Sequence, residues 1–194
     1  MINKKDITGI ILAGGKSSRM GTDKGFLKLN SKPFIQYSIE ALQPLVSEII
    51  IVSNNIEYDS LGLKRVNDII NNAGPVAGIY SGLEASKTEF NLVLSCDIPL
   101  ISTEVLKKLI DAIDETSEII QIENNKKTMP LIALYKKHVK DAFKALLQQD
   151  ERRLRIAIKS RKSKNIILEK EHQFSTMNIN TKEELKIIED DYTR

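Results

Sequence analysis

The stretch from residue 12 to residue 24 holds the densest group of chemically useful residues in the chain. It reads Leu-Ala-Gly-Gly-Lys-Ser-Ser-Arg-Met-Gly-Thr-Asp-Lys and follows the apolar run Ile7–Leu12, which is typical of a buried strand. Its glycines let the backbone turn tightly and approach a ligand closely. Lys16, Arg19 and Lys24 add positive charge to the same loop. Exposed amides together with cations suit a chain of phosphate groups, so the loop predicts binding of a nucleoside triphosphate.

The glycine loop does not fit the two best-known phosphate-binding patterns. A Walker loop reads Gly-x-x-x-x-Gly-Lys-Ser/Thr, and Gly15-Lys16-Ser17 could form its second half. The first glycine would then fall at Ile10, whereas Gly9 is one place away and belongs to the predicted strand. The dinucleotide pattern Gly-x-Gly-x-x-Gly is not matched either. A different kind of triphosphate loop and an ordinary tight turn between strand and helix therefore both remain open at this point.

Asp97 is a second candidate, because it comes directly after the apolar run Phe90–Ser95. Mg²⁺ in proteins is commonly held by one or two carboxylates together with phosphate oxygens of the substrate. Pro99 would help to stiffen the turn that carries the aspartate. If both apolar runs are parallel strands of one sheet, their carboxyl ends lie at the same edge, where Asp97 would meet the glycine loop. The local sequence also allows the plainer interpretation of a turn residue that leads into the next helix.

Short apolar runs alternate with helical patterns along the chain, which favours an α/β fold: a mostly parallel sheet with helices on both faces. The predicted strands cover residues 7–12, 48–52, 64–66, 90–95, 119–122, 130–134 and 165–168. The predicted helices cover residues 33–43, 75–85, 102–113, 136–147 and 151–159, with a final one from 181. Ser102 and Thr181 are expected to cap helices, and Glu184 would complete a capping box with Thr181. A length of 194 residues suggests one domain, spanning 1–194.

The composition narrows the class of protein. Charged residues make up 28% and the formal net charge is +3, which is too small to argue for a nucleic-acid partner. The single cysteine excludes an intramolecular disulfide framework and fits a reducing compartment. The first residues lack the apolar stretch of a signal peptide, and no run approaches the roughly 20 apolar residues of a membrane span. We therefore expect a cytoplasmic protein without a membrane partner.

The pattern at residues 12–24 resembles the signature loop of the molybdenum cofactor guanylyltransferase (MobA) family. The Gly14-Gly15 pair and Asp23-Lys24 are similar to the guanylyl branch, whereas cytidylyltransferases more often carry Ala-Gly. Further motifs in the same order extend the resemblance over nearly the whole chain. They are Gly74-Pro75-Val76-Ala77-Gly78, Cys96-Asp97-Ile98-Pro99, Pro130–Leu134, Glu151-Arg152-Arg153 and Asn178-Ile179-Asn180-Thr181 followed by Glu183-Glu184-Leu185. The resemblance implies a Rossmann-like nucleotidyltransferase fold of the glycosyltransferase-A type.

The resemblance also implies roles for particular residues. Nucleotide contacts fall on Leu12, Ala13, Gly14, Lys24, Asn54, Asp68 and Asp97. Asp97 would also bind Mg²⁺, and Arg19 and Lys24 would stabilise charge on the phosphates during transfer. The pterin substrate would face Arg152, Arg153, Asn178 and Asn180. From the local sequence, Asp68 could also be a solvated turn residue, the arginines a helix surface, and the two asparagines turn or capping residues.

The activity implied is transfer of GMP from GTP to molybdenum-bearing molybdopterin, with release of pyrophosphate. Other cofactor-biosynthesis proteins and molybdoenzymes or their chaperones are the protein partners that the resemblance suggests. Two alternatives stay open. One is a related transferase, such as a cytidylyltransferase, and the other is a non-enzymatic nucleotide sensor. Presence of Arg19, Lys24 and Asp97 together argues against the sensor, because binding alone does not need all three.

Overall fold

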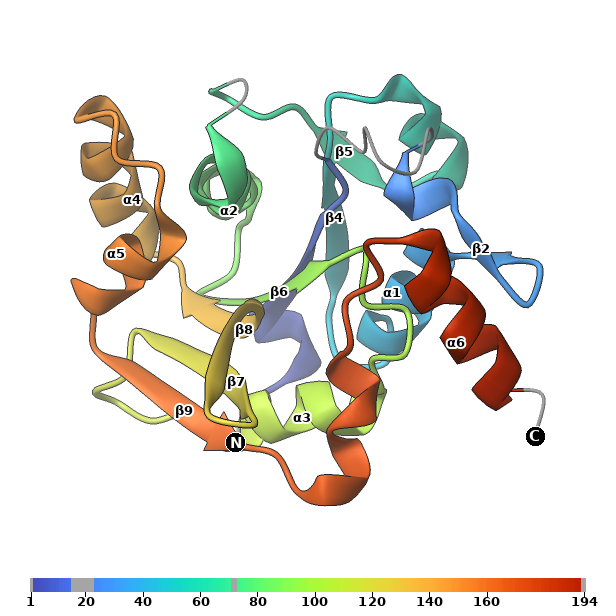
Figure 1. Cartoon of the computed structure of the whole chain (residues 1–194). Coiled ribbons are helices and arrows are strands. Elements are labelled where there is room, and N and C mark those ends of the chain that lie inside the picture. Colours follow the sequence, from blue (N-terminus) through green and yellow to red (C-terminus); the bar gives the residue numbers. More distant parts are fainter. Residues whose placement is uncertain (1, 15–22, 71–72, 193–194) are drawn as a thin grey trace.

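The computed structural model describes residues 2–14, 23–70 and 73–192, which fold around one seven-stranded sheet (Figure 1). The strand order is β5-β4-β1-β6-β8-β7-β9. Strand β1 (Ile7–Leu12) lies between β4 (Glu48–Val52) and β6 (Phe90–Ser95) and is parallel to both. Strand β5 (Lys64–Val66) extends the parallel part beyond β4. The first two predicted strands and those at 64–66 and 90–95 are thus confirmed at their predicted bounds.

The other half of the sheet is mixed. Strand β8 (Lys127–Lys136) runs antiparallel to β6 and to β7 (Ile119–Asn124), and β9 (Ser163–Ile167) is parallel to β7. Asn125 and Lys126 join β7 to β8 with positive φ angles of 49° and 61°, as a tight hairpin turn requires. The prediction of a mostly parallel sheet is therefore confirmed, with one strand reversed by this hairpin.

Helices cover both faces of the sheet (Figure 1). Helices α1 (Phe34–Leu42) and α3 (Thr103–Asp111) bury their apolar residues against one face. Helices α2 (Gly74–Ala85), α4 (Val139–Gln148) and α5 (Leu154–Lys159) pack on the other. Strand β1 supplies both cores, since Ile11 belongs to the first cluster and Ile10 to the second. A Cβ atom added to Gly82 of α2 would lie 2.5 Å from Ile10 Cγ2, so this helix approaches the sheet closely.

Several boundaries differ from the sequence prediction for physical reasons. Helix α4 begins at Val139 rather than Lys136, because Lys136 still pairs with Phe90 in the sheet. Helix α5 begins at Leu154 rather than Glu151, whose carboxylate accepts a bond from the Arg153 amide at 2.9 Å. The predicted strand 165–168 is β9 at 163–167. Ser102 caps α3 as predicted, accepting a bond from the Val105 amide at 3.3 Å.

The C-terminal segment returns to the start of the chain. Helix α6 (Lys182–Tyr192) lies near α1 and the hairpin of β2 (Lys28–Leu29) and β3 (Lys32–Pro33) (Figure 1). Leu29, Phe34, Ile179 and Ile188 form a third buried cluster there. The short 3-10 helices are η1 (Lys4–Asp6), η2 (Lys24–Phe26), η3 (Ile56–Leu61), η4 (Lys170–His172) and η5 (Phe174–Thr176). Within the described ranges, no helix has both the length and the apolar character needed to cross a bilayer.

Candidate active site

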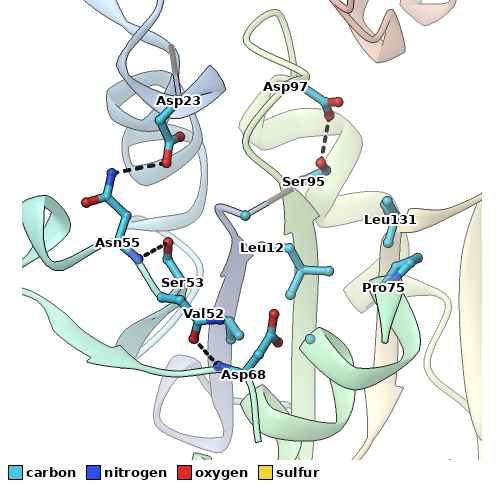
Figure 2. Close-up of a pocket in the computed structure, with 14 residues that line it drawn as sticks. Leu12, Asp23, Val52, Ser53, Asn55, Asp68, Pro75, Ser95, Asp97 and Leu131 are labelled. Atoms are coloured by element: carbon cyan, nitrogen blue, oxygen red, sulfur yellow. Dashed lines mark hydrogen bonds between the residues drawn. The ribbon is translucent and has the colours of Figure 1, made fainter. Parts of the chain in front are cut away.

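A cavity of about 750 Å³ opens beyond the carboxyl ends of the central strands (Figure 2). Leu12 of β1, Val52 of β4 and Ser95 of β6 contribute to its wall. Residues that follow these strands, among them Gly14 and Asp97, complete it. Ligands of open α/β sheets bind at this edge, so the predicted meeting of the glycine loop and Asp97 is confirmed for the part of the loop that the structure describes.

The Asp97 carboxylate is held from two sides. Its side chain is only 12% exposed. The Ser95 hydroxyl donates to Oδ1 at 2.6 Å, and the Lys24 ammonium lies 3.0 Å from Oδ2. The Cys96 amide donates to the Leu12 carbonyl at 3.1 Å, which continues the β1–β6 pairing by one step and fixes Asp97 beside the end of β1. Lys24 and Asp97 therefore form a partly buried ion pair at the edge where phosphates would bind.

Lys24 has a second partner that comes from the other end of the chain. Its ammonium donates to Asn180 Oδ1 at 2.5 Å. The backbone around Asn180 is fixed, because the Ile179 amide donates to the Asp97 carbonyl at 2.8 Å and the Asn180 amide donates to Glu184 Oε2 at 2.6 Å. Asn180, predicted as a pterin contact, thus lies in the Lys24–Asp97 cluster.

The predicted capping box fixes the backbone directly after Asn180. The Glu184 amide donates to Thr181 Oγ1 at 3.1 Å, and the Glu184 carboxylate accepts the Thr181 amide at the same distance. This confirms the start of α6 that the sequence predicts. The same cap holds the preceding residue, Asn180, beside Lys24.

Asp68 and Asn54 lie together on another wall of the cavity. The Asp68 amide donates to Asn54 Oδ1 at 3.0 Å. Asp68 Oδ1 is buried and has no hydrogen-bond partner among the described residues. Burial raises the pKa of this carboxyl group above its usual value. Figure 2 shows the carboxylate pointing toward Leu12, and an added Cβ at Gly78 would lie 3.5 Å from Oδ1. An unsatisfied buried acceptor of this kind is typical of a site that a ligand completes.

The predicted nucleotide contacts Leu12, Ala13 and Gly14 differ in whether they reach the cavity. Leu12 and Gly14 line the cavity. Ala13 is fully buried, and its amide donates to the Val52 carbonyl at 3.0 Å, so its backbone N–H is already used in the sheet. Arg19, the predicted partner of the phosphates, lies outside the described residues.

A second cavity of about 880 Å³ adjoins the first and shares Leu131 with it. Its wall is rich in apolar side chains, among them Met129 and Phe174. Arg153 and Asn178 supply polar groups. Asp97 lines the first cavity and the next residue, Ile98, lines the second, so one turn of the chain serves both.

The structure thus separates the four residues predicted to face the pterin. Arg153 and Asn178 line the second cavity, and Asn180 binds Lys24. Arg152 is half-exposed and forms an ion pair with Asp150 at 2.8 Å.

Sequence reasoning missed two polar groups of the site. Ser95 is the last residue of β6, and its hydroxyl fixes the orientation of Asp97. A polar residue at the end of a buried strand, two places before a candidate ligand, is the signal that could have found it. Asn55 lines the first cavity and donates to Asp23 Oδ2 at 3.2 Å, a contact between distant segments that has no local sequence signal.

A model of the MobA-like NTP transferase domain matches residues 9–164. The chain belongs to the MobA-like NTP transferase family. A probable molybdenum cofactor guanylyltransferase of Flavobacterium johnsoniae is 39% identical to this family member over 92% of the chain and 94% of the relative. The molybdenum cofactor guanylyltransferase of Vibrio parahaemolyticus is 31% identical over 95% and 96%. The predicted family is therefore confirmed.

The fold of this MobA-like NTP transferase is also confirmed by solved structures. The molybdopterin-guanine dinucleotide biosynthesis protein A of Archaeoglobus fulgidus superposes with a TM-score of 0.80 at 22% identity, covering 96% of this chain and 98% of its own. A second solved structure, the 4-diphosphocytidyl-2C-methyl-D-erythritol synthase of Anaerococcus prevotii, gives a TM-score of 0.75 at 16% identity. The α/β nucleotidyltransferase architecture is thus shared across enzymes named for different nucleotides.

The donor set around Asp97 fits a magnesium ion that is bound together with a nucleotide. Across residues 2–14, 23–70 and 73–192, no three His, Cys, Asp or Glu side chains gather closely enough to hold a metal by themselves. Mg²⁺ usually keeps several waters and takes one or two carboxylates plus substrate phosphates. Asp97, a buried carboxylate at the cavity wall, is a group of the kind that such a site requires.

Proposed function

We propose that this protein is a molybdenum cofactor guanylyltransferase: it transfers GMP from GTP to the terminal phosphate of molybdenum-bearing molybdopterin and releases pyrophosphate. The observation that supports this most strongly is the pair of adjoining cavities, which meet at Leu131 and at the turn of Asp97 and Ile98. Two substrates of different character can bind side by side there. The relatives named above carry this activity in their names.

In the proposed reaction, a pterin phosphate oxygen attacks the α-phosphorus of GTP. The bond between that phosphorus and the oxygen bridging to the β-phosphate breaks, and pyrophosphate leaves with the electron pair. Lys24 binds the phosphates. Asp97 would hold Mg²⁺, which would supply neutralisation of the charge on the triphosphate. Arg19 remains a proposed phosphate ligand on its sequence motif alone. These groups act by positioning and electrostatic stabilisation, the main sources of catalysis in such transfers.

Lys24 can bind the phosphates by exchanging its present hydrogen-bond partners for phosphate oxygens. In the structure its ammonium is shared between Asp97 Oδ2 and Asn180 Oδ1. Both partners are acceptors, so phosphate oxygens can replace them without leaving the ammonium unpaired. Ser95 keeps Asp97 Oδ1 oriented throughout, because its bond lies on the opposite side of the carboxylate.

Base selection is assigned to Asp68. Guanine presents neighbouring N1–H and N2–H donors on one edge, whereas cytosine presents a single donor group beside acceptors. A carboxylate only accepts, so the unpartnered Asp68 Oδ1 complements guanine and not cytosine. Asn54 holds the Asp68 backbone, and Leu12 and Gly14 form the wall next to it. Ala13 supports this wall through the bond from its backbone amide to the Val52 carbonyl.

The pterin is assigned to the second cavity. Its apolar wall suits a flat ring system, and Arg153 and Asn178 provide hydrogen-bonding groups for polar edges or for the phosphate. Arg152 lies on the neighbouring surface. We further infer a single domain over 1–194, action in the cytoplasm, and delivery of the product to other cofactor-handling proteins or to molybdoenzymes and their chaperones.

A pyrophosphate-release assay with each of the four nucleoside triphosphates, Mg²⁺ and molybdenum-loaded molybdopterin tests the proposal. Release with GTP, loss of release in Asp97→Ala and retention of a folded protein in that variant are the expected results. In that variant Lys24 loses the Asp97 carboxylate as an acceptor but keeps its bond to Asn180, so the circular dichroism spectrum should be unchanged.

Two other outcomes would replace the proposal. Release with CTP in place of GTP would identify a cytidylyltransferase, an activity compatible with the shared architecture. Binding of GTP without pyrophosphate release under any of these conditions would identify a nucleotide sensor. A thermal-shift comparison of GTP and CTP in the presence of Mg²⁺ identifies the nucleotide without the pterin, and stabilisation by CTP alone would exclude the guanylyl activity.

A further inference from the structure

The Asp23 carboxylate, next to Lys24 in the chain, receives three hydrogen bonds. The Gly25 amide donates to Oδ1 at 3.0 Å, and the Asn55 side chain donates to Oδ2 at 3.2 Å. The Tyr58 hydroxyl donates to Oδ1 in a short bond. Asp23 also caps the 3-10 helix η2, which Lys24 begins. The backbone that carries Lys24 is therefore fixed by its neighbour.

Tyr58 is built into the scaffold that provides these bonds. Its side chain is fully buried in the first core cluster and its ring stacks on Phe26, with centroids 4.5 Å apart. Burial raises the pKa of the Tyr58 phenol far above its usual value, so the hydroxyl stays protonated and acts as a donor. A Cβ atom on Gly25 would overlap this hydroxyl oxygen. The glycine after Lys24 is thus explained by the approach of Tyr58 to the backbone.

Asn55 is fixed independently of Asp23. The backbone amide of Asn55 donates to Ser53 Oγ at 3.1 Å. Its side-chain oxygen caps η3 by accepting a bond from the Glu57 backbone amide at 3.0 Å. Both side chains that donate to Asp23, Asn55 and Tyr58, therefore come from the segment that directly follows β4. The segment that carries Lys24 is anchored to it.

The anchoring matters because Lys24 has a long side chain that must change partners. Its ammonium contacts Asp97 and Asn180 in the structure, and binding of a triphosphate would replace these contacts. The anchor at Asp23 would then be the constraint that keeps the Lys24 backbone in place. We propose that Tyr58 is a positioning residue which acts through Asp23 to aim Lys24 at the triphosphate. This inference rests on the proposed function for the role of Lys24.

Tyr58→Phe is the variant that tests the inference. It removes the donor to Asp23 and keeps the ring that stacks on Phe26. We expect Mg·GTP to bind more weakly, by up to about tenfold, with a parallel fall in kcat/KM. The lost bond is present in the free and the bound protein alike, so only the part of its energy that keeps Lys24 in position reaches the binding constant. Tyr37→Phe is the matched control, because it also removes one tyrosine hydroxyl, which donates to the Leu29 carbonyl at 2.8 Å away from both cavities. The control should bind Mg·GTP as the natural protein does.

A double-variant cycle separates positioning from a general structural effect. If Tyr58 acts through Lys24, Tyr58→Phe should weaken Mg·GTP binding in the natural background and have no further effect in Lys24→Ala, while thermal unfolding shifts equally in both backgrounds. Unchanged Mg·GTP affinity in Tyr58→Phe, or the same loss in both backgrounds, would overturn the inference. Failure of the natural protein to bind Mg·GTP would instead overturn the proposed function, so the two failures are distinguishable.

Discussion

Replacing Asp68 by Asn should stabilise the free protein and weaken its binding of GTP at the same time. Asp68 Oδ1 is buried without a partner among the described residues, and burial raises the pKa of the carboxyl group. The ionised side chain therefore destabilises the folded protein, and a ligand that donates to it removes this cost. Asparagine has nearly the same shape and no charge.

The expected magnitudes follow from the contacts at Asp68. A buried polar group without a partner costs about 1–3 kcal/mol, and a neutral amide should recover about 1 kcal/mol of that. For a chain of this length such a gain raises Tm by about 2–4 °C. Loss of one bond from guanine to a charged acceptor should weaken Mg·GTP binding by about 10- to 160-fold, since such a bond is worth about 1.5–3 kcal/mol. The Asn54 bond to the residue 68 amide is unaffected by the change.

The stability gained in Asp68→Asn should depend on pH, because the pKa of Asp68 differs between the folded and the unfolded protein. The pKa of Asp68 is raised in the folded protein above the usual value of 3.8. As pH rises from that value through the folded-state pKa, the unfolded chain releases its proton first, and the natural protein loses stability relative to Asp68→Asn. The Tm of the variant minus that of the natural protein should therefore be small near the usual pKa, grow with pH and level off once the folded carboxyl group is ionised.

Differential scanning fluorimetry between weakly acidic and neutral pH, with isothermal titration calorimetry for Mg·GTP, measures both effects. Asp141→Asn is a charge-matched control: Asp141 is exposed in the first turn of α4, where a negative charge is mildly favourable, so this variant should be slightly less stable and bind Mg·GTP normally. A lower Tm for Asp68→Asn at neutral pH, or natural affinity for Mg·GTP, would refute the reasoning about Asp68.

Three further variants test other parts of the structure. Ser95→Ala should raise the Mg²⁺ concentration needed for half-maximal activity several-fold, because Asp97 loses the donor that orients it; an unchanged magnesium titration would contradict this. Asn180→Ala should alter the affinity for Mg·GTP while pterin titration at saturating GTP stays as before, and the reverse pattern would return Asn180 to the pterin site. Gly82→Ala should lower the free energy of unfolding by about 1–3 kcal/mol in urea titration, because its Cβ would press on Ile10; a neutral result would mean that α2 can move away from the sheet.

The sequence predicted those features that depend on local patterns. Apolar runs predicted β1 and β6 at their observed bounds, and the side chains of Ser102 and Thr181 predicted two helix starts, since a cap is a contact between residues three apart. The boundary of α4 was less predictable, because Lys136 belongs to the sheet through pairing with Phe90, a residue distant in sequence.

The site was predictable as a set of residues but not as a set of contacts. Lys24 and Asp97 could be placed together because both follow strands of a parallel sheet. The bond from Lys24 to Asn180 joins residues 156 positions apart, and the pattern of the sequence carries no signal for it. The sequence carries no signal for the role of Tyr58 either. It is a buried core residue, and only the structure shows that its hydroxyl donates to Asp23.

The third buried cluster has a practical consequence for where this protein can be cut. The family match ends at residue 164, yet Asn180, which binds Lys24, comes later. A protein shortened at that point would also expose Leu29 and Phe34, which are now fully buried beside Ile179 and Ile188. Two freshly exposed apolar side chains next to the site would favour aggregation. The unit to use for expression, crystallisation or transplantation into another enzyme therefore extends through α6, well past residue 164, where the family model ends.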